Sequence, residues 1–191
     1  MSEDRRDPPS GTASLVEAAQ SAAKKGPPPV HLWDPPLSGD MDMRIARDGT
    51  WFHEGTVIKR PALVRVFASI LKREGEEHFL VTPVEKWRIE VEDAPFVAID
   101  FDIEEGEDGS VLAFETNVGE RVRAGPDHAI TVVVDPETGE PSPYIHVRRG
   151  LQALIDRKSF YRLADLAQAE DGTMVVRSGG EAFAIGPSAE G

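Results

Sequence analysis

Apolar and polar residues alternate over much of the middle of the chain, which is the pattern of half-buried β-strands. The alternation is clearest in residues 87–91 and 97–103. Such segments recur about every 8 to 15 residues with turn signals between them, and this spacing favours an antiparallel meander or barrel over a parallel sheet. The expected strands cover residues 41–45, 50–52, 56–58, 79–81, 87–91, 97–103, 111–116, 121–123, 130–134, 144–147, 173–177 and 181–185.

Helical spacing predicts a first helix near the N-terminus. Ser14 to Glu17 fits a capping box, and alanines follow as far as the stop signal at Gly26. We therefore expect a helix over residues 13–25. The side chains that would dock it on the rest of the protein are Leu15, Val16 and Ala19.

Three more helices are expected further along the chain. Pro61 suits the first position of a helix that runs to Arg73 and is closed by Gly75. Residues 149–156 and 159–169 also carry apolar side chains at helical spacing. Together with the strands, these helices predict an α+β fold with antiparallel sheets.

Composition and turn signals divide the chain into three parts. Residues 1–36 hold seven of the 15 prolines and form a Pro-rich tail with one short helix. Residues 37–83 form a small α+β subdomain, and residues 84–191 a second subdomain of antiparallel strands and helices. Residues 57–63 and 145–151 share a strand, an arginine and a helix start, which favours duplicated strand–helix subdomains. Any strand-to-helix step would look similar, so the duplication stays open.

Charge and composition exclude several classes of function. The 34 acidic residues outnumber the 21 basic ones, and the net charge of −13 argues against a nucleic-acid-binding protein. The absence of cysteine excludes disulfides, thiolate metal sites and a cysteine nucleophile. No apolar run approaches the roughly 20 residues of a membrane span, and the N-terminus lacks the layout of a secretory signal. We therefore expect a cytoplasmic protein without membrane partners.

The common catalytic and nucleotide-binding signatures are absent, and the five histidines lack metal-ligand spacing. We therefore expect no enzymatic activity, no metal and no cofactor. A hydrolase built on Glu90, Asp93 and His128 is an alternative, although strand alternation can turn these side chains to different faces.

Charge is segregated along the chain. The net charge is −8 between Glu85 and Asp108, and +4 between Tyr144 and Leu163. Arg148, Arg149 and Gly150 fall where a strand should end and a helix begin. Arginines at a helix start are unfavourable unless an anion compensates them. That anion is either a bound phosphate or carboxylate or a carboxylate of the protein, for which the candidates are Glu85, Glu90 and Asp93. Arg60, before Pro61, raises the same question.

Several further residues are candidates for a binding site. Trp87 follows Glu85 and Lys86 and either stacks on a ring or belongs to the core. Asn117 and His128 lie in turn-rich segments that could line a cleft.

The sequence blocks that carry most of these features resemble the bacterial family known as domain of unknown function 1285. The resemblance spans residues 29–163. It rests on Pro29 to Trp33, Asp48 to Trp51 with Gly55, Ile58 to Arg60 with Leu63 and Val64, Thr82 to Trp87, Val91 to Phe96, and Tyr144 to Leu151.

The resemblance implies a duplicated α+β arrangement, with a C-terminal half like a pleckstrin-homology barrel. It further implies a groove between the halves that takes a nucleotide-like ligand, and a role in signalling without established catalysis. Our leading hypothesis is therefore a sensor that binds a small anionic molecule. The residues assigned to its site are Arg60, Glu85, Lys86, Trp87, Asn117, Tyr144, His146, Arg148, Arg149 and Gly150. The alternative is a protein-interaction module that recruits a basic partner through the acidic face between Glu85 and Asp108.

Overall fold

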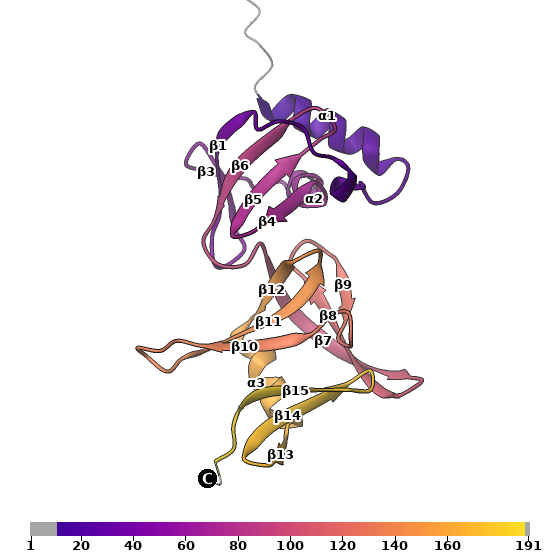
Figure 1. Ribbon diagram of the computed structural model, residues 1–191, viewed down its shortest axis with the longest axis vertical. Helices are drawn as coiled ribbons and strands as arrows, with labels where there is room; N and C mark the ends of the chain where they lie inside the picture. Colours follow the sequence, from indigo (N-terminus) through magenta and orange to yellow (C-terminus); the bar gives the residue numbers. More distant parts are fainter. Residues whose placement is uncertain (1–10, 190–191) are drawn as a thin grey trace, which may run out of the picture. The chain divides into compact units, whose positions relative to one another are not determined.

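The computed structural model describes residues 11–189, and the first ten residues of the expected tail lie outside this range (Figure 1). The chain forms two compact units. The N-terminal unit extends to Val91 but leaves out Ala46–Gly49, which group with Glu92 onward in the C-terminal unit. The sequence predicts the division after residue 83. The observed division lies later because the next strand pairs with earlier strands of the N-terminal unit.

The N-terminal unit contains a six-stranded sheet and two α-helices. The helices are α1 (Gly11–Ala23) and α2 (Pro61–Ser69), with a short 3-10 turn η1 (Val30–Leu32) between them. The strands are β1 (Gly39–Ile45), β2 (Trp51–His53), β3 (Thr56–Val57), β4 (Leu71–Glu74), β5 (Glu77–Val81) and β6 (Lys86–Val91).

Helix α1 is docked on this unit through Leu15 and Ala19, both buried, which confirms the expected contact. The helix begins at Gly11, so Ser14 lies inside it and the expected capping box is wrong. The Ser14 hydroxyl instead donates to Oε2 of Glu85 at 3.0 Å.

Helix α2 begins at Pro61 as expected, and its Phe67 ring stacks on Trp51 with the ring centroids 6.2 Å apart. The expectation that it continues to Arg73 is wrong, because the residues after Ile70 form β4 and pair with β5. Gly75 does not end a helix but lies in the β4–β5 hairpin with φ +60°, a backbone conformation that suits glycine.

The C-terminal unit contains a second six-stranded sheet, one helix and a small three-stranded sheet. The large sheet consists of β7 (Phe96–Gly106), β8 (Gly109–Thr116), β9 (Arg121–Arg123), β10 (Ile130–Val134), β11 (Pro141–Arg148) and β12 (Leu151–Ile155). Helix α3 (Arg157–Leu166) follows, and then β13 (Gln168–Glu170), β14 (Thr173–Ser178) and β15 (Glu181–Pro187). The sequence did not predict β13.

The two large sheets have the same topology. Their strand orders are β3-β2-β1-β6-β5-β4 and β9-β8-β7-β12-β11-β10. Each consists of two antiparallel three-stranded meanders, joined at the centre by one parallel pair, β1 with β6 and β12 with β7. The expectation of purely antiparallel sheets is therefore wrong at the centre of each sheet. A parallel neighbour requires a long connection, and here the four intervening strands provide it.

The similar sequences of residues 57–63 and 145–151 do not lie in equivalent elements of the two units. The first segment leads from β3 into α2, whereas the second runs from β11 into β12. The helix expected over residues 149–156 is wrong, because Leu151, Ala153 and Ile155 of β12 are buried in the alternating manner of a strand. The helix expected from Ser159 begins two residues earlier, where Asp156 caps α3.

Within residues 11–189, none of the helices is both long enough and apolar enough to span a membrane.

Candidate functional site

The Arg148-Arg149-Gly150 segment forms a β-hairpin turn and not a helix start. Arg149 and Gly150 have φ values of +45° and +78° and connect β11 to β12. Two consecutive positive φ angles are typical of the tight turns that match the twist of a hairpin. The helix-terminus argument for an anion site therefore does not apply to this segment.

Arg148 already has an anion within the protein. Its guanidinium lies 2.7 Å from Oε1 of Glu120 and 5.3 Å from the centre of the Phe96 ring. Burial lowers the pKa of Arg148 from its ordinary value, while Glu120 opposes this effect. The counter-ion of Arg148 is thus Glu120, and not one of the carboxylates considered from the sequence, which were Glu85, Glu90 and Asp93. Arg149 is exposed and forms no ion pair within the described part of the chain.

The amide of Gly150 is also engaged. It donates to Nε2 of His146 at 3.0 Å, so Nδ1 of that ring carries the proton and donates to the Asp127 carbonyl at 2.9 Å. The His128 ring lies 6.1 Å from the His146 ring, and its Nδ1 contacts the His146 carbonyl oxygen at 3.0 Å. His146 and His128 therefore brace the hairpin.

Asn117 links two backbone segments of the C-terminal unit. Its Oδ1 accepts from the Val97 amide at 3.0 Å, and its Nδ2 donates to the Gly49 carbonyl at 3.4 Å. Gly49 has φ +88°, and a Cβ there would lie 2.5 Å from Nδ2 of Asn117. Asn117 therefore fixes the short segment 46–49 that carries Arg47.

The remaining predicted residues lie in the N-terminal unit. Glu85 accepts from Ser14 and, at 3.4 Å, from the Trp87 indole. Lys86 forms a 2.5 Å ion pair with Glu74, and this contact is the largest cause of the lowered pKa of Glu74. Trp87 is half-buried, in contact range of Gly39. Arg60 precedes α2, is exposed, and has no ionic partner among residues 11–189.

The acidic face is compensated by arginines at several positions along β7. Asp100 pairs with Arg162, which also donates to the Phe101 carbonyl. Arg121 contacts Asp102 at 3.3 Å and Glu104 at 2.6 Å. The pKa of Asp100 is lowered, chiefly by the hydrogen bond from the Phe101 amide and further by the one from Arg162. The pKa of Glu104 is lowered as well, and the hydrogen bond from Arg121 is the largest cause.

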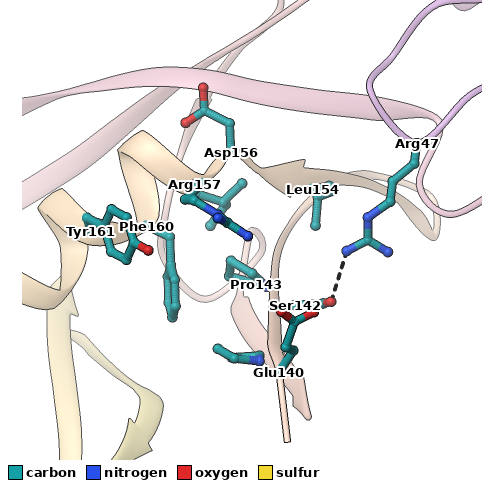
Figure 2. A pocket seen from close by; sticks show the side chains of 11 residues that line it. Arg47, Glu140, Ser142, Pro143, Leu154, Asp156, Arg157, Phe160 and Tyr161 are labelled. Atoms are coloured by element: carbon teal, nitrogen blue, oxygen red, sulfur yellow. Dashed lines mark hydrogen bonds between the residues drawn. The ribbon is translucent and has the colours of Figure 1, made fainter. Parts of the chain in front are cut away.

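A cavity of about 520 Å³ lies in the C-terminal unit, between the first turn of α3 and the adjoining ends of β11 and β12. Figure 2 shows the rings of Phe160 and Tyr161 at one side, Arg47 at the other, and Arg157 between them. The apolar part of the wall also comes from prolines and branched side chains. The lining residues are Arg47, Glu140, Pro141, Ser142, Pro143, Leu154, Ile155, Asp156, Arg157, Phe160 and Tyr161.

Two cations and two carboxylates lie on this wall. Asp156 is occupied as the helix cap, because its Oδ1 accepts from the Ser159 amide at 2.8 Å. Arg47 contacts Asp93 at 2.8 Å and donates to Ser142 Oγ at 3.1 Å. Arg157 is exposed, and within residues 11–189 its side chain has neither an ion pair nor a hydrogen bond. Arg157 is thus the cation of the cavity whose charge is least compensated.

The sequence prediction missed the residues of this cavity. The helix start expected at Arg149 lies at Arg157. Asp156 followed by Ser159 is a helix-start signal that would have placed Arg157 in the first turn of α3. No local pattern points to Arg47, which lies in the turn between β1 and β2.

Comparison with known proteins gives a consistent assignment. The model of the N-terminal domain of the domain of unknown function DUF1285 matches residues 28–94, and that of the C-terminal domain matches residues 95–185. The crystal structure of a DUF1285 family protein from Silicibacter pomeroyi DSS-3 has 56% identity and a TM-score of 0.84, and the match covers 92% of this chain and 96% of that one. A second member, from Shewanella baltica OS155, has 30% identity and a TM-score of 0.52 over 65% of this chain and 91% of its own.

No curated protein matches the chain. The two family models together cover most of the sequence and meet within a few residues of the boundary between the compact units. The protein is therefore a member of the DUF1285 family.

Proposed function

We propose that this protein binds a small anionic molecule with a flat apolar part, of the nucleotide class, in the cavity at the start of α3. The observation that carries the proposal is Arg157, an exposed cation without a partner in the described chain that lies beside Phe160 and Tyr161. A guanidinium can bind an acidic group, and neighbouring aromatic rings can cover an apolar one.

The position of Arg157 adds to this argument. The first turn of α3 contains Arg157 and Lys158 and no acidic residue, although Asp156 caps it. A helix N-terminus carries a partial positive charge, so the added cations favour an anion there. The cavity volume of about 520 Å³ also lies within the 300–1,000 Å³ that is typical of small-molecule sites.

In this proposal the protein acts as a sensor, and ligand binding rather than catalysis is its biochemical role. A pleckstrin-homology-like character of the C-terminal unit belongs to the same proposal. Its support is a curled six-stranded sheet that is followed directly by a helix (Figure 1). The alternative of recruiting a basic partner has less support, because several carboxylates along β7 are already paired with arginines.

A thermal-shift screen with nucleotides, phosphorylated metabolites and carboxylates tests the proposal. A ligand at 100 times its dissociation constant adds about 2.7 kcal/mol, or roughly 2–4 °C in a protein of this size. We expect a dose-dependent shift that Arg157→Ala abolishes. Lys158→Ala is the matched control, since it removes the same charge from the same helix turn but lies outside the cavity wall. A flat panel, or an equal loss in both variants, would overturn the proposal.

A further inference from the structure

Besides Ser142 of the cavity wall, the second cation of the cavity, Arg47, contacts residues that do not line the cavity. Its NH1 lies 2.8 Å from Oδ2 of Asp93, and its backbone amide donates to Oε2 of Glu92 at 3.0 Å. The hydroxyl of Tyr144 donates to Oδ1 of Asp93 at 2.6 Å. Asp93 is thus fixed from one side by Tyr144 and contacts Arg47 on the other.

We infer that Asp93 and Tyr144 are positioning residues, which hold the Arg47 guanidinium at the cavity wall for capture of an anionic ligand. This inference rests on the proposed function above and extends it to residues outside the cavity. It gives Tyr144, which the sequence assigns to the ligand site itself, a role that acts through Asp93 and Arg47.

The hydrogen-bonding capacity of arginine allows Arg47 to be held and to bind at the same time. A guanidinium has five N–H groups in a fixed plane. One donates to Ser142 Oγ, and NH1 lies at ion-pair distance from Oδ2 of Asp93 without a hydrogen bond to it, so other N–H groups remain for a ligand. Figure 2 shows the Arg47 side chain turned toward Ser142 at the edge of the cavity. Because the guanidinium is oriented in advance, the ligand loses less free energy to side-chain ordering.

Burial differs between the two partners of this ion pair. The Asp93 side chain is 16% exposed, whereas that of Arg47 is 59% exposed and so remains open to a ligand. Burial, together with the hydrogen bond to Asp93, raises the pKa of Tyr144 above its usual value. The Tyr144 hydroxyl therefore keeps its proton, and remains a donor, throughout the neutral range.

A double-mutant cycle tests the inference, with calorimetric titration of adenosine monophosphate as the measurement. We expect Tyr144→Phe to weaken binding about three- to tenfold in the wild-type background. In the Arg47→Ala background the same substitution should change affinity by less than about twofold, because the side chain through which it acts is gone. Thr131→Val is the control: it removes an exposed hydroxyl of the neighbouring strand β10, outside the cavity wall, and should show no coupling to Arg47→Ala.

The role of Asp93 is tested by comparison with its neighbour. Asp93→Asn and Glu92→Gln remove the same charge, but only Asp93 contacts the guanidinium of Arg47. We expect weaker binding in Asp93→Asn than in Glu92→Gln. If Asp93→Asn binds adenosine monophosphate as tightly as Glu92→Gln or more tightly, Asp93 competes with the ligand and the inference is overturned.

The outcomes distinguish a failure of this inference from a failure of the proposed function on which it rests. If Arg157→Ala weakens binding but Tyr144 shows no coupling to Arg47, the inference is wrong and the proposed function stands. If the wild-type protein binds neither adenosine monophosphate up to millimolar concentration nor any compound of the thermal-shift panel, both are overturned.

Discussion

The backbone amide of Gly150 donates to Nε2 of His146 at 3.0 Å. The amide that seemed available to an anion therefore already has an acceptor within the same hairpin. The neighbouring Arg148 likewise has Glu120 as its counter-ion at 2.7 Å. Both contacts assign a structural role to the turn between β11 and β12, and they direct the search for a ligand to the cavity at α3.

Replacement of His146 should destabilise the hairpin. His146→Ala removes the acceptor for the Gly150 amide and the donor to the Asp127 carbonyl. We expect a loss of about 1–2 kcal/mol in the free energy of unfolding, since each net hydrogen bond contributes about 0.5–1.5 kcal/mol. Urea denaturation measures this loss. His31→Ala, at an exposed position, should change stability by less than about 0.5 kcal/mol.

The Arg148–Glu120 pair should matter for stability and not for ligand affinity. Glu120→Ala leaves the half-buried guanidinium without its counter-ion, and we expect a loss of about 1–3 kcal/mol. Arg148→Met keeps an apolar side chain near Phe96 and should cost less. Chemical denaturation combined with titration of adenosine monophosphate checks both statements. A tenfold loss of affinity in Arg148→Met at unchanged stability would contradict them.

The strands were more predictable than the ends of the helices. Alternation located β6 and β7 because successive side chains of a strand point to opposite faces, a period that depends only on local geometry. It did not predict burial along the whole apolar face of β7, where Ile99 and Ile103 are exposed. Leu151, Leu154 and Ile155 also fit helical spacing, and only pairing with β11 and β7 decides that they form a strand. In a segment of five residues, tertiary contacts outweigh the local pattern.

Acid should weaken the fold through His78. Burial, assisted by the charge of Arg73, lowers the pKa of His78 to about 4. In the unfolded chain the pKa of His78 is near 6.5. Between about pH 6.5 and pH 4, His78 therefore binds a proton in the unfolded state but not in the folded state. Stability should therefore fall as the pH is lowered through this range, and this residue should account for about 2 kcal/mol between pH 7 and pH 4.5.

Denaturation of His78→Leu at the same two pH values checks this expectation. The variant should lose less stability than the wild type on acidification, by about 2 kcal/mol. His53→Leu, at a half-buried histidine of β2, serves as the comparison. If His78→Leu and the wild type have the same pH dependence, the protonation of His78 is not the cause.

Gly49 should be more sensitive to substitution than Gly55. Both have positive φ angles, +88° and +75°, so alanine strains the backbone at either position. At Gly55 a Cβ meets nothing within 4 Å, whereas at Gly49 it would lie 2.5 Å from the Asn117 amide. We expect Gly49→Ala to cost about 1–2 kcal/mol more than Gly55→Ala in thermal or urea denaturation. Equal costs would show that Asn117 adapts freely.

The cavity was less predictable than the strands for a physical reason. Arg47, Ser142 and Arg157 are brought together by the docking of segment 46–49 and by the ends of β11 and α3. Each of these residues alone has the sequence environment of an ordinary surface turn. A stronger signal was the Asp156 cap, which marks the start of α3 and with it Arg157, the cavity arginine that has no partner among the described residues.

The central claim is that the cavity arginine, and not the hairpin arginine, binds the anion. Calorimetric titration of adenosine monophosphate into Arg157→Ala and Arg149→Ala compares two exposed arginines of the same unit at equal net charge. We expect Arg157→Ala to weaken binding about tenfold or more, as loss of a charged hydrogen bond implies, and Arg149→Ala to remain within about twofold of the wild type. The reverse order would place the site at the β11–β12 turn and contradict the account.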